Sequence, residues 1–300
     1  MTFSILICAL NEEKNIGLLL ENILEQVYDG EWILDNIVVV SDGSTDKTNE
    51  IVENFSKDNK KIVLIKNKER KGKAISFNEG KKNIFSDYLM SLDADVFLDK
   101  DVFSKVLQKI KSDCPDMATV HAKPKLDTSF NFSSFASMGT YYLMQEIIKN
   151  NRRSIYGARG VFVALSKEFY NKLELLDAPG TDMFMYLYCA SGNYKYQYIS
   201  STTVYFYPPK SFYDYRKQNH RASVAKDFYE RIFNSNYTCQ INFFDRLKIF
   251  IKSFIKHPVY IIVWFCFYFF SFVTMHFFKK EVPISSKWSV ACSTKAKYHL

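Results

Sequence analysis

Two carboxylates one residue apart, Asp93 and Asp95, follow an apolar run, Tyr88–Leu92, of the kind expected for a buried strand. In open α/β sheets, ligands collect at the carboxyl ends of strands, so this pair would lie at a ligand-binding edge. Oxygen-rich side chains at such an edge suit a hard divalent cation, which in turn binds phosphate oxygens. The pattern therefore predicts a divalent-cation site in contact with a diphosphate.

A second pair of the same spacing, Asp99 and Asp101, stands just before a helix that is predicted to begin near Val102. Asp is a favoured helix N-cap residue, so one of these two carboxylates is interpreted as a cap. The position directly after a strand separates Asp93 and Asp95 from this second pair.

Three further polar segments have the residue types of a nucleotide site. Asn11 and Glu12 follow the first predicted strand, although either could instead cap the next helix. Asp42 ends the second strand, Gly43 permits a tight turn, and Ser44 or Thr45 is expected to cap the following helix. The segment 70–74, Arg-Lys-Gly-Lys-Ala, offers cations and bare backbone to a diphosphate, or forms an exposed basic turn.

The elements that would position these residues alternate between strands and helices in the first half of the chain. Such alternation predicts right-handed βαβ units and a mostly parallel sheet flanked by helices. Later residues form looser, aromatic-rich helices and one more long strand. Strands are expected at 3–8, 36–40, 62–65, 88–92, 117–121 and 195–207, and helices at 13–26, 46–55, 73–84, 102–110, 130–150, 181–190 and 212–233.

In this order and spacing, the segments resemble glycosyltransferase family 2, a family of inverting enzymes with the GT-A fold. The likeness covers about residues 3–225. Each motif is short, and the ordered set carries the resemblance. One departure is Ser41, where many members have an Asp before the residue that corresponds to Asp42.

The resemblance implies a nucleotide-sugar donor, UDP- or GDP-linked, and a Mg²⁺ or Mn²⁺ cofactor held by Asp93 and Asp95. It implies that the donor contacts a set of residues around the strand ends. These are Ala9, Asn11, Glu12, Asp42, Lys73, Asp93 and Ala94, with Arg221 as a further contact to the diphosphate.

Transfer to a hydroxyl also needs a general base. Asp182, which follows Ala178-Pro179-Gly180-Thr181, is the candidate, and the alternative is a helix cap. Family members usually carry an acidic pair here, so Thr181 departs from the pattern while Asp182 keeps it. The resemblance also places Arg159 and Gly160 on the acceptor side.

Gln218 and Arg221 resemble part of the Gln-x-x-Arg-Trp motif of processive polysaccharide synthases, with Ala222 in the place of the Trp. Gln218 is therefore an expected acceptor contact. The replaced Trp and a single candidate membrane segment argue against a processive synthase that builds its own channel. Aromatic residues of an acceptor cleft are sought among Tyr205, Tyr207, Tyr213 and Tyr215.

The tail differs from the rest of the chain. Residues 259–278 contain no Asp, Glu, Lys or Arg and would span ~30 Å as a helix, so they are expected to cross a membrane or to re-enter it. Before them, 243–255 place apolar residues at helical spacing with basic residues between, which is typical of an interfacial helix. The alternative is a soluble aromatic core helix.

Charge and cysteine placement agree with a membrane-associated enzyme. The net charge is +8, and residues 243–300 hold nine of the basic side chains against only two acidic ones. This balance indicates an anionic membrane surface and argues against a nucleic-acid partner. The six cysteines are scattered without zinc spacing, which favours a reducing compartment, so the catalytic domain is expected on the cytoplasmic face of a membrane.

The sequence thus predicts a catalytic domain over 1–240, divided into a nucleotide-sugar half (1–122) and an acceptor half (123–240), and a membrane-associating tail over 241–300. The expected activity is hexosyltransferase-type transfer to a hydroxyl of a lipid-linked or polysaccharide acceptor. Transfer to polyprenyl phosphate is the nearest rival. A non-catalytic nucleotide-sugar-binding scaffold at the membrane is the rival from another class.

Overall fold

The computed structural model covers the chain and describes all residues except 128–129, 151–154, 234–240, 278–284, 286 and 288–300. In the described part, one eight-stranded sheet runs through the molecule with the strand order β3-β2-β1-β4-β7-β6-β8-β5. The strands are β1 (Thr2–Ala9), β2 (Ile33–Asp42), β3 (Ile62–Asn67), β4 (Tyr88–Asp93), β5 (Val96–Leu98), β6 (Met117–Pro124), β7 (Phe162–Ser166) and β8 (Tyr196–Phe206).

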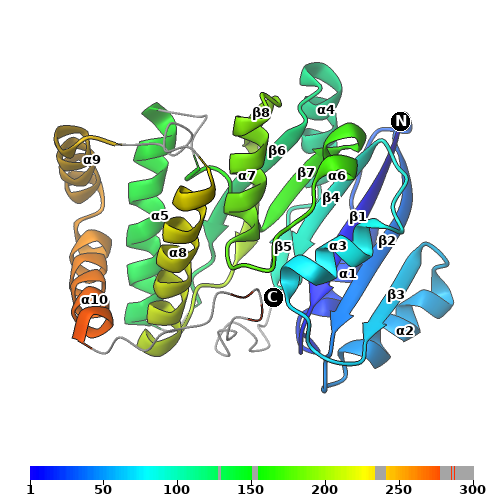
Figure 1. Ribbon diagram of the computed structural model, residues 1–300, viewed down its shortest axis with the longest axis horizontal. Coiled ribbons are helices and arrows are strands. Elements are labelled where there is room, and N and C mark those ends of the chain that lie inside the picture. The colour runs from blue at the N-terminus through cyan, green and yellow to red at the C-terminus, as the bar shows by residue number, and fades with distance from the viewer. Residues whose placement is uncertain (128–129, 151–154, 234–240, 278–284, 286, 288–300) are drawn as a thin grey trace.

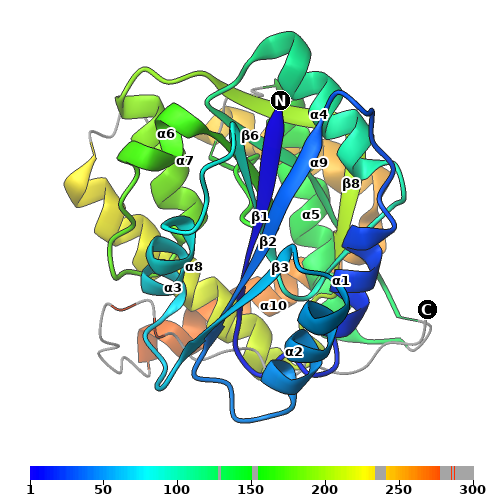
Figure 2. The same ribbon diagram turned by 90° about the vertical axis from the view of Figure 1, so that its right-hand side faces the viewer.

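Helices cover both faces of the sheet (Figure 2). The expected elements are present, mostly with ends shifted by a few residues. The helices are α1 (Ile16–Leu24), α2 (Thr48–Asp58), α3 (Lys73–Lys81), α4 (Val102–Asp113), α5 (Phe132–Asn150), α6 (Lys167–Lys172), α7 (Thr181–Ser191), α8 (Phe212–Ile232), α9 (Phe243–Lys256) and α10 (Pro258–Phe277).

The two faces of the sheet bury separate apolar clusters. On one face, Leu20 of α1 and Val106 of α4 pack under alternating residues of β1, such as Ile5 and Ile7. On the other face, α3, α6 and α7 cover Leu6 and its neighbours. The period of two along each strand sends successive side chains to opposite clusters, so β1 is apolar almost throughout. This two-sided burial makes the central strands a rigid base for the loops at their ends.

The sheet is mixed, but four of the seven pairings between its described strands are parallel, so the expectation of a mostly parallel sheet is confirmed. Strands β1 to β4 are parallel as expected, but β7 is antiparallel to both β4 and β6, and β5 is antiparallel to β8. Strand β7 begins at the edge where β4 ends, since Phe162 pairs with Leu92. The loop before β7 therefore lies next to Asp93, and the Asp93 N–H donates to the Val161 carbonyl over 3.3 Å.

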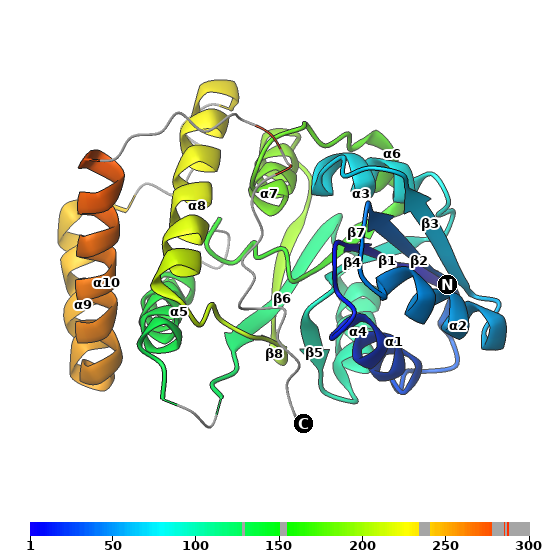
Figure 3. The same ribbon diagram turned by 90° about the horizontal axis from the view of Figure 1, so that it is seen from below.

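Helices α5, α8, α9 and α10 extend the molecule beyond the sheet, at the end away from α2 and β3 (Figures 1 and 3). Helix α9 forms over the expected interfacial segment, and α10 forms over the described part of segment 259–278. In the part of the chain that the structure describes, no helix is long and apolar enough to pass through a membrane. The expected spanning segment is thus not supported.

Candidate active site

The loops after β1 and β2 are fastened to each other by side chains that the sequence marked as donor contacts. Asn11 has a left-handed backbone (φ 54°), and its Oδ1 accepts from the Thr45 N–H over 2.8 Å. Its own N–H donates to Ser44 Oγ over 3.0 Å. The expected cap by Ser44 or Thr45 is wrong, because Lys47 is the N-cap residue of α2 and Asp46 Oδ1 accepts from the N–H of Thr48, the first residue of that helix, over 3.0 Å.

Glu12 is buried beside this junction. Its N–H donates to Thr48 Oγ1 over 2.7 Å, and its carboxylate accepts from the Asn15 side-chain amide over 2.9 Å. Asn15, at the N-cap position of α1, makes no side-chain bond to the helix end, so the capping alternative for Asn11 and Glu12 is wrong. Ala9, the last residue of β1, is buried between these loops and pairs in register with Ser41.

Asp42 holds the basic loop through its backbone. The buried carboxylate accepts from the N–H of Lys71 over 2.7 Å and from the N–H of Gly72 over 2.9 Å. Gly43 has φ 72°, and a Cβ built there would lie 2.6 Å from the backbone nitrogen of Arg70. The glycine is therefore required for the close approach of the two loops. The segment 70–74 is a fixed part of the strand-end cluster and not a loose basic turn.

Lys73, the first residue of α3, forms an ion pair with Asp93. Burial opposes the charge of Lys73, but the adjacent Asp93 carboxylate prevails and raises the pKa of the lysine above its usual value. The thiol of Cys8, beside the same loop, has its pKa raised to about 12 by burial and is not a nucleophile. Lys73 thus presents a stable positive charge next to the predicted diphosphate position.

Asp93, Ala94 and Asp95 lie at the end of β4, where the sequence placed them. The Asp93 and Asp95 side chains are partly buried, and Ala94 is buried between them. In the described part of the chain, no cluster of three or more His, Cys, Asp or Glu side chains forms a complete metal cage. Two carboxylates still fit Mg²⁺ or Mn²⁺ if phosphate oxygens and water supply the other ligands.

Asp182 is the second residue of α7 and faces the loop before β7. Its carboxylate accepts from the Gly160 N–H over 3.1 Å and from the Met183 N–H over 3.0 Å. The N-cap residue of α7 is Gly180, with φ 76°, so the capping alternative for Asp182 is wrong. A Cβ on Gly160 would lie 3.1 Å from the Asp182 Cβ, so the glycine leaves room for this close approach. The carboxylate is thus held in one orientation by backbone donors.

Among the described residues, the Arg159 side chain contacts a sulfur atom and an aromatic ring. Its guanidinium donates to the Met144 sulfur over 3.6 Å and lies over the Phe206 ring at 5.0 Å. Burial lowers its pKa, while the nearby Asp182 and Asp93 carboxylates oppose that shift. The structure therefore brings Arg159, Asp182, Asp93 and Lys73 into one electrostatic neighbourhood.

The two α8 residues from the partial motif are less firmly placed. Gln218 is partly buried, and Arg221 is exposed. Within the described residues, neither forms a hydrogen bond or ion pair with the donor-side carboxylates, so their expected contacts stay predictions. Similarly, Asp101 stands at the N-cap position of α4 without a side-chain cap bond and pairs instead with Lys105 over 2.6 Å.

Sequence reasoning missed a polar cluster beside Arg159. His121 lies between two tyrosines, with Nδ1 at 2.7 Å from the Tyr198 hydroxyl and Nε2 at 3.1 Å from the Tyr141 hydroxyl. Burial, with the nearby Lys123 and Arg159 cations, lowers the pKa of His121 and favours its neutral form. Strand alternation could have placed His121 on one face of β6, but its partners come from β8 and α5.

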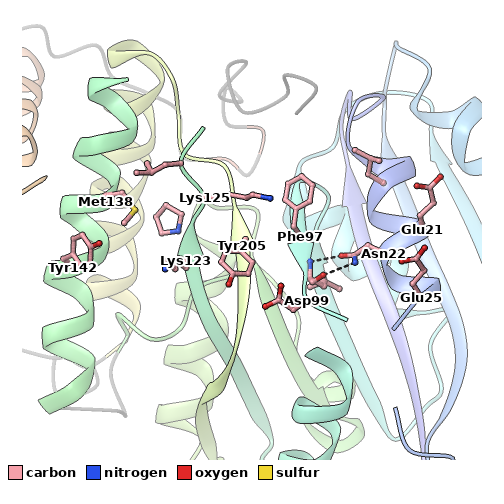
Figure 4. A pocket seen from close by; sticks show the side chains of 14 residues that line it. Glu21, Asn22, Glu25, Phe97, Asp99, Lys123, Lys125, Met138, Tyr142 and Tyr205 are labelled. Carbon is pink, nitrogen blue, oxygen red and sulfur yellow. Dashed lines mark hydrogen bonds between the residues drawn. The ribbon is translucent and has the colours of Figure 1, made fainter. Parts of the chain in front are cut away.

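A cavity of about 650 Å³ lies apart from this cluster, between α1 and α5 (Figure 4). Asn22 exchanges two hydrogen bonds with the Leu98 backbone at its wall, over 2.9 and 2.7 Å. Tyr205 lines the cavity, whereas Tyr207 and Tyr215 are buried elsewhere and Tyr213 is exposed. Apart from Tyr205, none of the residues predicted for the donor, metal, base or acceptor roles lines this cavity.

Comparison with known proteins gives relatives of one kind. The family model of glycosyl transferase family 2 matches residues 4–184. Poly-beta-1,6-N-acetyl-D-glucosamine synthase of Staphylococcus aureus is 31% identical over 121 residues, which are 40% of this chain and 28% of the relative. A synthase of the same name from Staphylococcus epidermidis is 30% identical over 123 residues. The matched region is thus under a third of the length of these curated relatives.

Solved structures agree in fold. The mannosyltransferase PcManGT of Pyrobaculum calidifontis, in complex with GDP-Man and Mn²⁺, superposes with a TM-score of 0.59 at 15% identity, covering 93% of this chain and 76% of that one. S. aureus TarS with UDP-GlcNAc gives a TM-score of 0.55 at 17% identity, covering 84% and 79%. At such identities the likeness concerns the fold. The family model, which spans more than half of the chain, together with the strand-end cluster, shows that this chain belongs to glycosyltransferase family 2.

Proposed function

We propose that this glycosyltransferase moves a sugar from a nucleotide-diphospho-sugar to a hydroxyl of a lipid-linked or polysaccharide acceptor, with inversion at the anomeric carbon. The observation that carries the proposal is the grouping of Asp182, Arg159, Lys73 and Asp93, in which a held carboxylate faces a cation-rich strand edge. In-line displacement requires a base on one side of the reacting sugar and a diphosphate-binding edge on the other.

The donor would lie along the ends of β1, β2 and β4. Lys73 would contact the diphosphate, and Asp42 would act by fixing the 71–72 backbone beneath it. A bound Mg²⁺ or Mn²⁺, held by Asp95 with Asp93, would offset the charge that develops on the leaving nucleoside diphosphate. Because one relative is named for N-acetylglucosamine and another was solved with UDP-GlcNAc, UDP-GlcNAc is the first donor to test.

Asp182 would remove the proton of the attacking hydroxyl. Backbone donors from Gly160 and Met183 hold the carboxylate toward the acceptor side, so little reorganisation is needed at the moment of attack. Arg159 would contact the acceptor or a phosphate that it carries. Its methionine and phenylalanine partners leave the guanidinium's hydrogen-bonding capacity available to such a group.

We also propose that the acceptor is met at the cytoplasmic face of a membrane. The support is chemical: the tail is basic, and α9 and α10 carry many exposed large apolar side chains. A lipid-linked acceptor would then lie in the same membrane that the lipid-facing surface of the enzyme contacts.

The test is a donor screen on the purified full chain. UDP-GlcNAc, other UDP-sugars and GDP-sugars are incubated with Mn²⁺, Mg²⁺ or EDTA, and released nucleotide and donor binding are both measured. We expect metal-dependent release or binding with one donor. If no donor were bound or turned over with any metal, the transferase proposal would be overturned.

The acceptor class is tested with Asp182→Asn. If the acceptor is a hydroxyl, loss of the base lowers kcat by about 10²–10⁴-fold. A polyprenyl phosphate acceptor is already ionised, so the same substitution would then change kcat little. Thr181→Ala, next to Asp182 in α7, is the matched control and should leave the rate close to that of the natural protein.

A further inference from the structure

The outer side of α10 exposes a continuous apolar stripe. Val259, Ile262, Phe265, Phe269 and Phe272 recur at intervals of three and four residues and are each 51–57% exposed. This spacing puts them on one side of the helix. On the other side, Ser271 is buried, and Tyr260 and Trp264 meet Gly139 of α5. The stripe therefore faces away from the protein over the described length of the helix.

Helix α9 presents a matching stripe next to a row of cations. Phe244 is 72% exposed and Ile255 is 74% exposed, with Leu247 and Ile251 between them, while Ile249 and Ser253 are buried on the inner side. Lys248 and Lys252 stand one helical turn apart and are exposed. Lys248 has only a loose ion pair, 3.9 Å from Asp245. Aromatic and aliphatic side chains beside lysines are the composition of a surface that binds lipid.

The inner side of this helix pair is fixed to α5. At Gly139, an added Cβ would lie 2.5 Å from the Tyr260 carbonyl oxygen, so α10 approaches the α5 backbone closely. The ring of His257, between α9 and α10, stacks on Tyr142 with centroids 3.5 Å apart. Lys256 pairs with the buried Glu146 over 3.0 Å. The pair is thus a rigid extension of the catalytic domain.

We infer that the outer face of α9 and α10 lies flat in the headgroup layer of a membrane that contains anionic lipids. This deepens the membrane part of the proposed function by naming the surface and its orientation. Lipid phosphates match the lysine row, and acyl chains match the stripes. A second copy of this chain fits less well, because a two-fold contact through this face would bring like lysine rows together.

The flat orientation follows from what covers the two helices. In the described part of the chain, the inner sides of α9 and α10 pack on α5. Lipid can therefore reach the pair from the side opposite α5. Helix α5 also contacts Arg159 through Met144. Docking would therefore set the distance of the acceptor-side cation from the bilayer surface.

Vesicle co-sedimentation of the purified full chain tests the inference. Vesicles of phosphatidylcholine alone are compared with vesicles that also contain phosphatidylglycerol, at low and high salt. We expect tighter binding to the anionic vesicles, weakened by salt, and a loss of about tenfold or more in Phe244→Glu/Phe269→Glu and in Lys248→Glu/Lys252→Glu. Phe85→Glu is the matched control, because Phe85 is 71% exposed and lies outside the helix pair.

The inference is overturned if the helix-pair variants and Phe85→Glu bind vesicles equally well. It is also overturned if light scattering shows a dimer of the natural protein that the same variants abolish, or if bound protein resists extraction by alkaline carbonate as a spanning protein does. Circular dichroism confirms that each variant is folded. Donor release by the natural protein without vesicles reports the proposed transferase function separately, so either proposal can fail alone.

Discussion

The donor side and the acceptor side of the sheet hold their charged groups in different ways. On the proposed donor side, the Asp42 and Asn11 side chains accept hydrogen bonds from the backbone of a neighbouring loop. On the acceptor side, Arg159 has a sulfur and a ring for partners. The difference indicates that the proposed diphosphate position is preformed by the protein, whereas the proposed acceptor position keeps a cation available to the substrate.

The substitution with the largest expected effect on the proposed donor side is Asp95→Asn. If Asp95 is the metal ligand on the donor side, its loss should lower kcat by about 10²–10³-fold at saturating Mn²⁺, since charge on the leaving group is then uncompensated. Steady-state nucleotide release measures the effect. Asp101→Asn, in the second pair of the same spacing, is the control, and an equal loss there would remove the distinction between the two pairs.

Substitution of Asp42 tests whether the donor side is preformed by the protein. Asp42→Ala leaves two N–H groups without their carboxylate, and we expect about 3 kcal/mol lower stability and a higher donor KM. Asp42→Asn retains one acceptor oxygen and should lose about half as much. Urea unfolding and donor titration measure the two effects. Unchanged unfolding in both variants would show that these bonds do not stabilise the loop.

Gly139→Ala tests the junction between α5 and the helix pair. An added methyl must displace α10, at a cost of about 1–3 kcal/mol, while the donor side should keep its affinity for nucleotide. Hydrogen exchange in α10 reports the loosening. Gly17→Ala in α1 is the control, because its Cβ would meet Ile51 at an ordinary 3.4 Å. Equal protection of α10 in both variants would contradict the close approach.

The smallest effect concerns acid pH at the same junction. Hydrogen bonds from Lys149 and Lys256 hold the pKa of Glu146 below its ordinary value of 4.5. A depressed folded-state pKa contributes stability above the unfolded value, and this contribution is lost as pH falls through the folded value. Because both lysines are more than half exposed, we expect less than about 1 kcal/mol. Unfolding from pH 6 to 3 should show this loss, and Glu146→Gln should lack it.

Much of the candidate site could be predicted from the sequence because its residues follow strand ends. Asp42, Asp93 and Asp95 end or follow apolar runs, and Asp182 begins a helix, and the structure places all four at one edge. The cap expected from Ser44 or Thr45 was predicted wrongly, since Lys47 is the N-cap residue of α2 and Ser44 Oγ accepts from the Asn11 N–H instead. A cap is a local bond, whereas this partner of Ser44 lies 33 positions away in the chain.

By itself, the sequence determined the order of strands and helices, the polar segments at strand ends and the apolar stripes of α9 and α10. These features depend on spacing along the chain, which periodicity makes readable. The tertiary structure decided the antiparallel entry of β7, the choice of Asp93 by Lys73, and the place of His121 between Tyr141 and Tyr198. These partners come together only when segments that are distant in the sequence pack against each other. A local sequence pattern does not indicate which of several possible partners a side chain will contact.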